Sequence, residues 1–209
     1  MTCYKWVLDG FYPASTHFFS FRKGISKDHG FFVRFCGNNY FQSPLPMNVD
    51  FRPILPSDQP FLWEMLYQAL YVPPGKPVFS RAILDEPDIA CYVQGWGRPG
   101  DWGWLARAGE THAGAIWLRQ WMGVEKGYGY VSPFIPELSI ALLPEYRNMG
   151  LGTRMLEKVI SMARAQFPGL SLSVVESSPA RRLYERLGFR QVGQVMESLV
   201  MLLEWNNNA

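Results

Sequence analysis

The chain has 209 residues, of which 48% are hydrophobic and 18% charged, and its formal net charge is +2. Such a composition is typical of a globular protein, and this length allows one hydrophobic core with an appendage. Residues 1–46 carry five Lys/Arg and two Asp/Glu, whereas residues 47–209 carry fifteen and sixteen. The body therefore has no electrostatic footprint for nucleic acid, and no apolar run approaches the roughly 18 residues of a membrane span. We therefore expect the protein to bind neither nucleic acid nor a membrane.

The three cysteines, Cys3, Cys36 and Cys91, form an odd set with neither metal-ligand spacing nor a C-x-x-C pair. This usage favours a reducing compartment, so we expect a cytoplasmic protein that holds no metal. Cys91 falls in an expected helix, where we predict that it packs as a small hydrophobic residue.

Residues 1–46 differ from the rest of the chain, because they hold twelve aromatic residues without a sustained period of two or 3.6. One interpretation is an upstream stretch translated from a misassigned start, with the true chain beginning at Met47. The other is an N-terminal arm that covers a groove or a partner. Acidic residues and bulky aromatics disfavour a transit peptide. We therefore divide the chain into an extension, 1–46, and a globular domain, 47–209.

The first half of the domain predicts a strand near 49–55, a helix from Ser57 and Asp58 to about 71, and a second helix from Pro87. Two strands, 104–108 and 111–120, follow as a hairpin with a Gly-Glu turn. On the second of these strands Trp117 and Arg119 share one face, and Ile116 and Leu118 share the other.

The second half opens with a short apolar strand, 138–143, and a glycine loop. Apolar residues then recur every three or four positions from Leu151 to Phe167 and predict an amphipathic helix. A strand at 170–175 precedes a short helix that Ser178 caps and Gly188 ends, and two final strands span 189–194 and 197–204. The order β-α-α-β-β-β-α-β-α-β-β predicts an α/β (α+β) fold, with a mixed central sheet of about seven strands and four helices.

Gly150 and Gly152 stand where the strand and loop meet the long helix. The first turn of a helix presents N–H groups without intrahelical partners, and glycine lets an anion approach them. Arg147 and Thr153 can add a charge-assisted contact and a hydroxyl donor. A nucleotide P-loop would need a lysine after Gly152, and a dinucleotide fingerprint would need a small residue at Met155. The pattern therefore predicts another kind of phosphorylated ligand.

Two motifs carry a resemblance to a known family. Residues 147–152, R-N-M-G-L-G, resemble the [QR]-x-x-G-x-[GA] signature of the GNAT superfamily of acyl-CoA N-acyltransferases. Residues 178–189, S-P-A-R-R-L-Y-E-R-L-G-F, are similar to its second signature, N-P-A-x-x-L-Y-x-x-x-G-F, with Ser178 in place of the usual asparagine. The resemblance covers about residues 48–205. It implies the GNAT fold and an enzyme that moves an acetyl group from acetyl-CoA, as cosubstrate, to a primary amine.

The resemblance also implies roles for particular residues. Glu137 would be the general base, unless it is merely a solvated or Arg-paired carboxylate. Tyr184 would protonate the CoA sulfur, unless it is only a core tyrosine. The cofactor-binding residues implied are Leu142, Leu143, Arg147, Asn148, Met149, Gly150, Leu151, Gly152, Thr153, Ser178 and Arg181, although a solvated helix face would equally explain Arg181.

The acceptor would be a small amine or a peptide N-terminus. It would attack the thioester directly in a ternary complex, because no serine or cysteine stands beside His17, His29 or His112 to form a covalent intermediate. Candidate contacts are the aromatic residues Tyr71, Tyr92, Trp96, Trp102, Trp117, Tyr128 and Tyr130 and the acidic residues Asp85, Glu86, Asp88 and Glu125. A non-catalytic acyl-CoA sensor is the alternative, and a homodimer is one possible assembly. A structural domain without a cofactor would leave both glycine motifs unexplained.

Overall fold

A computed structural model describes residues 48–205. The predicted extension at 1–46, with Cys3 and Cys36, lies outside the described residues, so the domain boundary remains a prediction. The elements are β1 (Val49–Pro53), α1 (Gln59–Ala69), α2 (Pro87–Ala90), β2 (Asp101–Ala108), β3 (Thr111–Arg119), β4 (Glu137–Leu142), α3 (Leu151–Ala163), β5 (Gly169–Val175), α4 (Ala180–Arg186), β6 (Arg190–Val195) and β7 (Ser198–Glu204). Their order confirms the predicted one. Within residues 48–205, no helix is long and apolar enough to cross a membrane.

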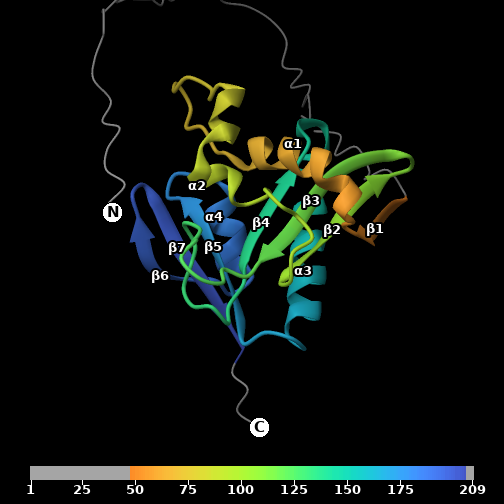
Figure 1. Ribbon diagram of the computed structural model, residues 1–209. Helices are drawn as coiled ribbons and strands as arrows, with labels where there is room; N and C mark the ends of the chain where they lie inside the picture. The colour runs from red at the N-terminus through yellow and green to blue at the C-terminus, as the bar shows by residue number, and fades with distance from the viewer. Residues whose placement is uncertain (1–47, 206–209) are drawn as a thin grey trace, which may run out of the picture. The chain divides into compact units, whose positions relative to one another are not determined.

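All seven strands form one sheet, in the order β1-β2-β3-β4-β5-β7-β6 (Figure 1). Every neighbouring pair is antiparallel except β4 and β5. These two central strands are parallel and pair at a single position, between Glu137, the first residue of β4, and Ser171, the third residue of β5. The strands therefore diverge from this point, and the two halves of the sheet separate toward the carboxyl ends of β4 and β5.

Helices cover both faces of the sheet. On one face α3 buries Leu151, Met155, Leu156, Val159, Ile160 and Ala163, the spacing that predicted this helix. Ile116 and Leu118 of β3 contribute to the same core, whereas Trp117 packs on the opposite face with α1. This confirms the predicted alternation along β3. Each fully buried aliphatic side chain contributes roughly 1.5–3 kcal/mol, so the two cores fix the sheet between its helices.

The predicted second helix is much shorter than its apolar spacing suggested. It makes one turn, and residues 91–97 continue as turns in which Gly95 and Gly97 have φ of +64° and +102°. Glycine adopts these left-handed conformations readily, and they end a helix. The Arg119 guanidinium donates to the carbonyl oxygens of Cys91 and, at 3.0 Å, Gln94. Tertiary contacts therefore replace the helix that local periodicity predicted.

Both ends of α4 follow the prediction. The Ala180 N–H donates to Ser178 Oγ at 3.3 Å, so the serine supplies the expected cap although the helix begins at Ala180. After α4, Gly188 has φ of +94° and closes the helix in the left-handed conformation.

Candidate active site

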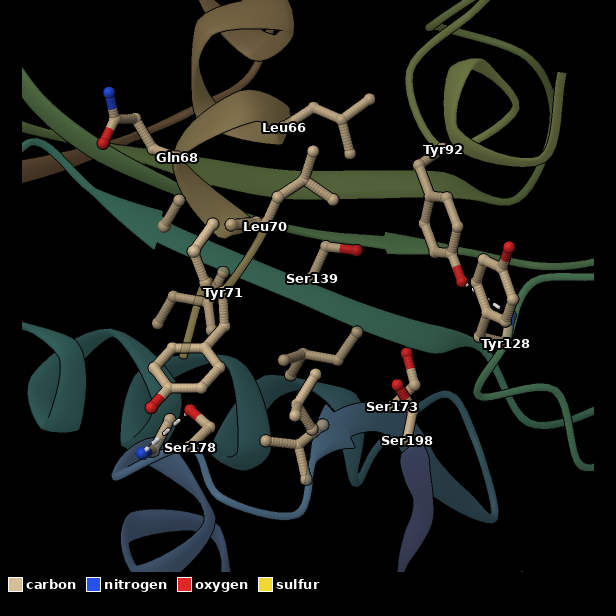
Figure 2. A pocket seen from close by; sticks show the side chains of 18 of the residues that line it. Leu66, Gln68, Leu70, Tyr71, Tyr92, Tyr128, Ser139, Ser173, Ser178 and Ser198 are labelled. Carbon is tan, nitrogen blue, oxygen red and sulfur yellow. Dashed lines mark hydrogen bonds between the residues drawn. The ribbon is translucent and has the colours of Figure 1, made fainter. Parts of the chain in front are cut away.

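A cleft of about 930 Å³ opens where β4 and β5 diverge (Figure 2). Its lining includes Arg147 and Gly152 at the start of α3 and Glu137 at the point where the two strands still pair. The end of α1 and the turn between β6 and β7 also line it. One space therefore connects the glycine loop with the predicted base.

Backbone groups of β4 face this space. The Leu143 N–H donates to the Ala113 carbonyl of the β3 side at 3.0 Å. Because an antiparallel ladder alternates, the amides of Ile140 and Leu142 must face the other way, toward β5. The Leu142 amide is therefore free of the β3 ladder and faces the cleft side, as a backbone contact to a ligand would require. Leu143 differs from the expectation, since its N–H is already used within the sheet.

The glycine loop gives α3 an open N-terminus. Asn148 and Gly150 have φ of 60° and 79°, and no side chain caps the helix. A Cβ atom at Gly150 would have no neighbour within 4 Å, and one at Gly152 would touch only Leu142 Cδ1, at 3.7 Å. Packing and backbone conformation therefore do not require glycine at 152. The free N–H groups and the open space beside them fit a phosphate-bearing ligand.

The other residues predicted to bind the cofactor have varied positions. Ser178 is buried and lines the cleft. Leu151 is fully buried, so it can offer only backbone groups, whereas Met149 and Thr153 are half-buried. Arg181 does not line the cleft; it forms ion pairs with Glu176 and Glu185 at 3.3 and 2.8 Å on the exposed side of α4. This arrangement matches the solvated-face interpretation of Arg181.

Arg147 links the loop to α1. Its Nε donates to the Leu142 carbonyl at 3.0 Å and its Nη2 to Gln68 Oε1 at 2.6 Å. The guanidinium thus holds the loop after β4 against the end of α1. A phosphate contact by Arg147 would have to share these hydrogen bonds.

Glu137 is the first residue of β4 and only 2% exposed. Its Oε1 accepts from the Tyr92 hydroxyl at 2.8 Å and the Gly129 N–H at 2.7 Å, and its Oε2 accepts from Trp121 Nε1 at 2.8 Å. The alternative interpretation held that this carboxylate is solvated or paired with an arginine. Within the described part of the chain, the structure shows neither arrangement. Burial raises the pKa of Glu137, and hydrogen bonds from Tyr92, Gly129, Trp121 and Ser173 partly oppose that effect.

A glycine-containing loop closes over this carboxylate. A Cβ atom at Gly127 would lie 2.1 Å from Glu137 Oε2, and one at Gly129 would lie 2.6 Å from Oε1. The loop can approach this closely only with glycine at both positions. The Tyr128 N–H between them donates to the Tyr92 hydroxyl at 2.6 Å (Figure 2). Sequence analysis assigned no role to these glycines, although their alternation with tyrosines over 127–130 was a usable signal of close backbone approach.

Tyr184 combines a core position with access to the cleft. Its ring packs edge-on against Phe189, with 5.9 Å between centroids, and the residue lines the cleft. Burial raises the pKa of Tyr184 to about 12, so its hydroxyl stays protonated at neutral pH. Within residues 48–205 this hydroxyl has no hydrogen-bond partner, which leaves it available to a ligand.

The structure narrows the predicted acceptor contacts. Of the candidate aromatic residues, Tyr71, Tyr92 and Tyr128 line the cleft. The candidates that do not line it are Trp96, Trp102, Trp117, Tyr130, Asp85, Glu86, Asp88 and Glu125. Trp96 and Trp117 are instead buried in the core beneath α1. The Tyr71 hydroxyl donates to the Ser177 carbonyl at 3.3 Å, so this side chain bridges the end of α1 and the loop before α4. Figure 2 shows Tyr71 beside Ser178 of the same loop.

Comparisons with known proteins place the chain in a family. Residues 63–189, more than half of the chain, match the profile of the acetyltransferase (GNAT) family. A search of curated protein sequences gives no significant match. Among solved structures, yncA of Salmonella typhimurium, determined with its cofactor acetyl-CoA, is 17% identical with a TM-score of 0.57, and the alignment covers 78% of this chain and 96% of that one.

Two further structures share the fold. The PaiA N-acetyltransferase of Thermoplasma acidophilum, in complex with coenzyme A, is 16% identical with a TM-score of 0.57 and coverage of 76% and 100%. The ribosomal-protein-S18-alanine N-acetyltransferase of Escherichia coli is 18% identical with a TM-score of 0.55 and coverage of 78% and 99%. At these identities the likeness supports the fold, and the profile match supports the family. The chain belongs to the GNAT family of acetyltransferases.

Proposed function

We propose that the protein is an acetyl-CoA-dependent N-acetyltransferase that acetylates a primary amine by direct attack in a ternary complex. The observation that carries this proposal is the divergence of β4 and β5 after Glu137, which creates one cleft between the glycine loop and a buried carboxylate. Acetyl-CoA and coenzyme A in the yncA and PaiA structures support the choice of donor.

The donor would bind through backbone groups. The open N-terminus of α3 after Gly150 would hold its phosphates, and the amides of Ile140 and Leu142 would hold its amide-bearing arm. When bound, the donor supplies an acyl group activated as a thioester. These contacts need no particular side chain, which agrees with the open space at Gly152.

Two side chains would transfer protons, one as the base and one as the acid. An ammonium group is not a nucleophile, so Glu137 would accept a proton from the acceptor. The Ser173 hydroxyl, which lines the cleft and contributes to lowering the pKa of this carboxylate, would offer a path for that proton. Tyr184, protonated at working pH, would donate to the departing thiolate. With a pKa of about 12 it is a weaker acid than an ordinary phenol, so much of its effect would come from hydrogen bonding.

A titration followed by an activity assay tests the proposal. Acetyl-CoA should bind the full chain in isothermal titration, and thiol release should accelerate with at least one amine of a panel. Binding without release for any amine would point instead to an acyl-CoA sensor. Failure to bind acetyl-CoA would contradict the proposal at its first step.

Gly152→Val should separate ligand binding from stability. A valine here would extend into the open space beside the α3 N-terminus, where the Cβ atom meets only Leu142. We expect the free energy of unfolding to change by less than about 1 kcal/mol, while the Kd for acetyl-CoA rises by about tenfold or more. Titration and chemical denaturation measure the two quantities. Gly193→Val, on β6 with a similarly open Cβ position, should leave the Kd unchanged; equal affinity for both variants would exclude the α3 site.

A further inference from the structure

We infer that the acceptor is a primary amine attached to an uncharged, apolar body, an alkyl or aryl amine, and that a second ammonium group is discriminated against. This inference rests on the proposed function and specifies its substrate class. It comes from three features of the cleft: a single carboxylate at its inner end, apolar walls at its mouth, and the positions of its remaining charges.

The inner end of the cleft has one carboxylate and can therefore accept one amine nitrogen. Glu137 lies where β4 and β5 still pair, and the loop at Gly127 and Gly129 closes over it. The polar side chains that line the cleft near it are hydroxyls: Ser139, Ser173 and Ser198 from the strands, with Tyr92 and Tyr128 beside them (Figure 2). Hydroxyls can orient an amine and accept its hydrogen bonds without adding charge.

The mouth is apolar on both sides. Val78 and Phe79, from the segment after α1, are 74% and 43% exposed, and Val195 and Met196, from the β6–β7 turn, are 39% and 78% exposed. Segments more than a hundred residues apart in sequence thus bring exposed apolar side chains to one cleft. Exposed apolar surface of this kind marks a site that buries an apolar ligand. Leu66 and Leu70 of the α1 end extend the apolar wall inward (Figure 2).

The other charged groups lie away from the amine position. Among residues 48–205, Arg147 and Glu197 are the charged residues besides Glu137 that line the cleft. Arg147 is held at the glycine-loop end by Gln68, and Glu197 is exposed on the β6–β7 turn. A second ammonium group placed between the apolar side chains would therefore lose hydration, and the exposed Glu197 carboxylate at the turn would compensate only weakly, because exposed charge pairs contribute little.

A matched pair of amines tests this inference. Hexylamine and 1,6-diaminohexane share a six-carbon chain and differ by one terminal ammonium group. We expect kcat/KM, measured by thiol release, to be at least about tenfold higher for hexylamine. Titration of each amine into the complex of the protein with coenzyme A should show the same preference in Kd, with no chemistry required. The inference would be overturned if kcat/KM or affinity for the diamine equalled or exceeded that for hexylamine. Absence of hexylamine binding would also overturn it.

Two variants locate the preference. Met196→Glu places a carboxylate at the mouth and should reduce the hexylamine-to-diamine ratio by about tenfold. Val192→Glu, on β6 and 46% exposed but outside the lining of the cleft, should leave the ratio unchanged. An unchanged ratio in Met196→Glu would contradict the inference. Binding preference without thiol release would instead contradict the proposed transferase activity and leave the acceptor class standing.

Discussion

Replacing Glu137 with glutamine is expected to lower kcat by about 10²–10⁴ while the Kd for acetyl-CoA stays nearly constant. Glutamine has the shape of glutamate but cannot accept the proton of the acceptor amine. Its NH₂ group would also face a rigid N–H donor in either orientation, Gly129 at one oxygen position or Trp121 at the other. Loss of the buried negative charge offsets part of this conflict, so we expect activity to suffer far more than folding.

Steady-state kinetics over pH checks this expectation. Because burial raises the pKa of Glu137 above its ordinary 4.5, the base becomes protonated at a higher pH than a solvated glutamate would. In the native enzyme kcat/KM should therefore fall as the pH drops through that raised pKa, and this acid limb should be absent in Glu137→Gln. Glu157→Gln, on the exposed side of α3, provides the control. A variant with native kcat and an unchanged acid limb would exclude Glu137 as the base.

Arg119→Met is expected to lower the free energy of unfolding by about 3–5 kcal/mol. The side chains of Arg119 and Asp101 are both 1% exposed and form two hydrogen bonds, at 2.8 and 2.7 Å. Removing Arg119 takes away the nearest countercharge of this buried carboxylate and leaves it the Arg98 guanidinium, whose Nε lies 3.8 Å from Asp101 Oδ1, and the N–H groups of Gly97 and Arg98. The same guanidinium holds the Cys91 and Gln94 carbonyls, and Tyr92 between them reaches Glu137. Activity should therefore fall together with stability.

Chemical denaturation of three variants separates the causes. Arg107→Met breaks a pair with Asp50 whose side chains are 34% and 51% exposed, so its effect should be much smaller. Adding Asp101→Leu to Arg119→Met removes the poorly compensated charge and should restore part of the lost stability. The recovery should be incomplete, because the N–H groups of Gly97 and Arg98 lose their acceptor. Similar losses for Arg107→Met and Arg119→Met would show that burial does not determine the strength of this pair.

Sequence analysis predicted the fold well because, in most elements, the local sequence pattern agrees with the final structure. The periodicity of α3, the caps of α4 and the alternation along β3 all depend on neighbouring residues, and each has its expected place. The exception is α2, whose apolar spacing continued to Trp96 although the helix ends at Ala90. There the contacts of Arg119, a residue distant in sequence, determine the conformation, and local periodicity does not report them.

The candidate site was predictable to a different extent at its two ends. The glycine loop is a contiguous motif, so its position followed from the sequence. The surroundings of Glu137 come from three separate segments: the turns after α2 supply Tyr92, the β3–β4 connection supplies Trp121 and Gly129, and β5 supplies Ser173. These residues come together only in the folded chain. The acidic residues suggested for the acceptor, such as Asp88 on α2 and Glu125 in the β3–β4 connection, lie outside the cleft lining. Their sequence positions near the expected cleft elements do not report which way these short segments face.

The single residue pair between β4 and β5 also has a mechanical consequence. Strands β1 to β4 form one hydrogen-bonded unit and β5, β7 and β6 another, with one point of the ladder and the α3 crossover joining them. The ladder is therefore sparsest along this line, and we expect the two halves of the sheet to move relative to each other most easily there. A ligand bonded to the amides of Ile140 and Leu142 would lie in the position of a missing strand. Binding of a ligand in the cleft would then stiffen the whole sheet.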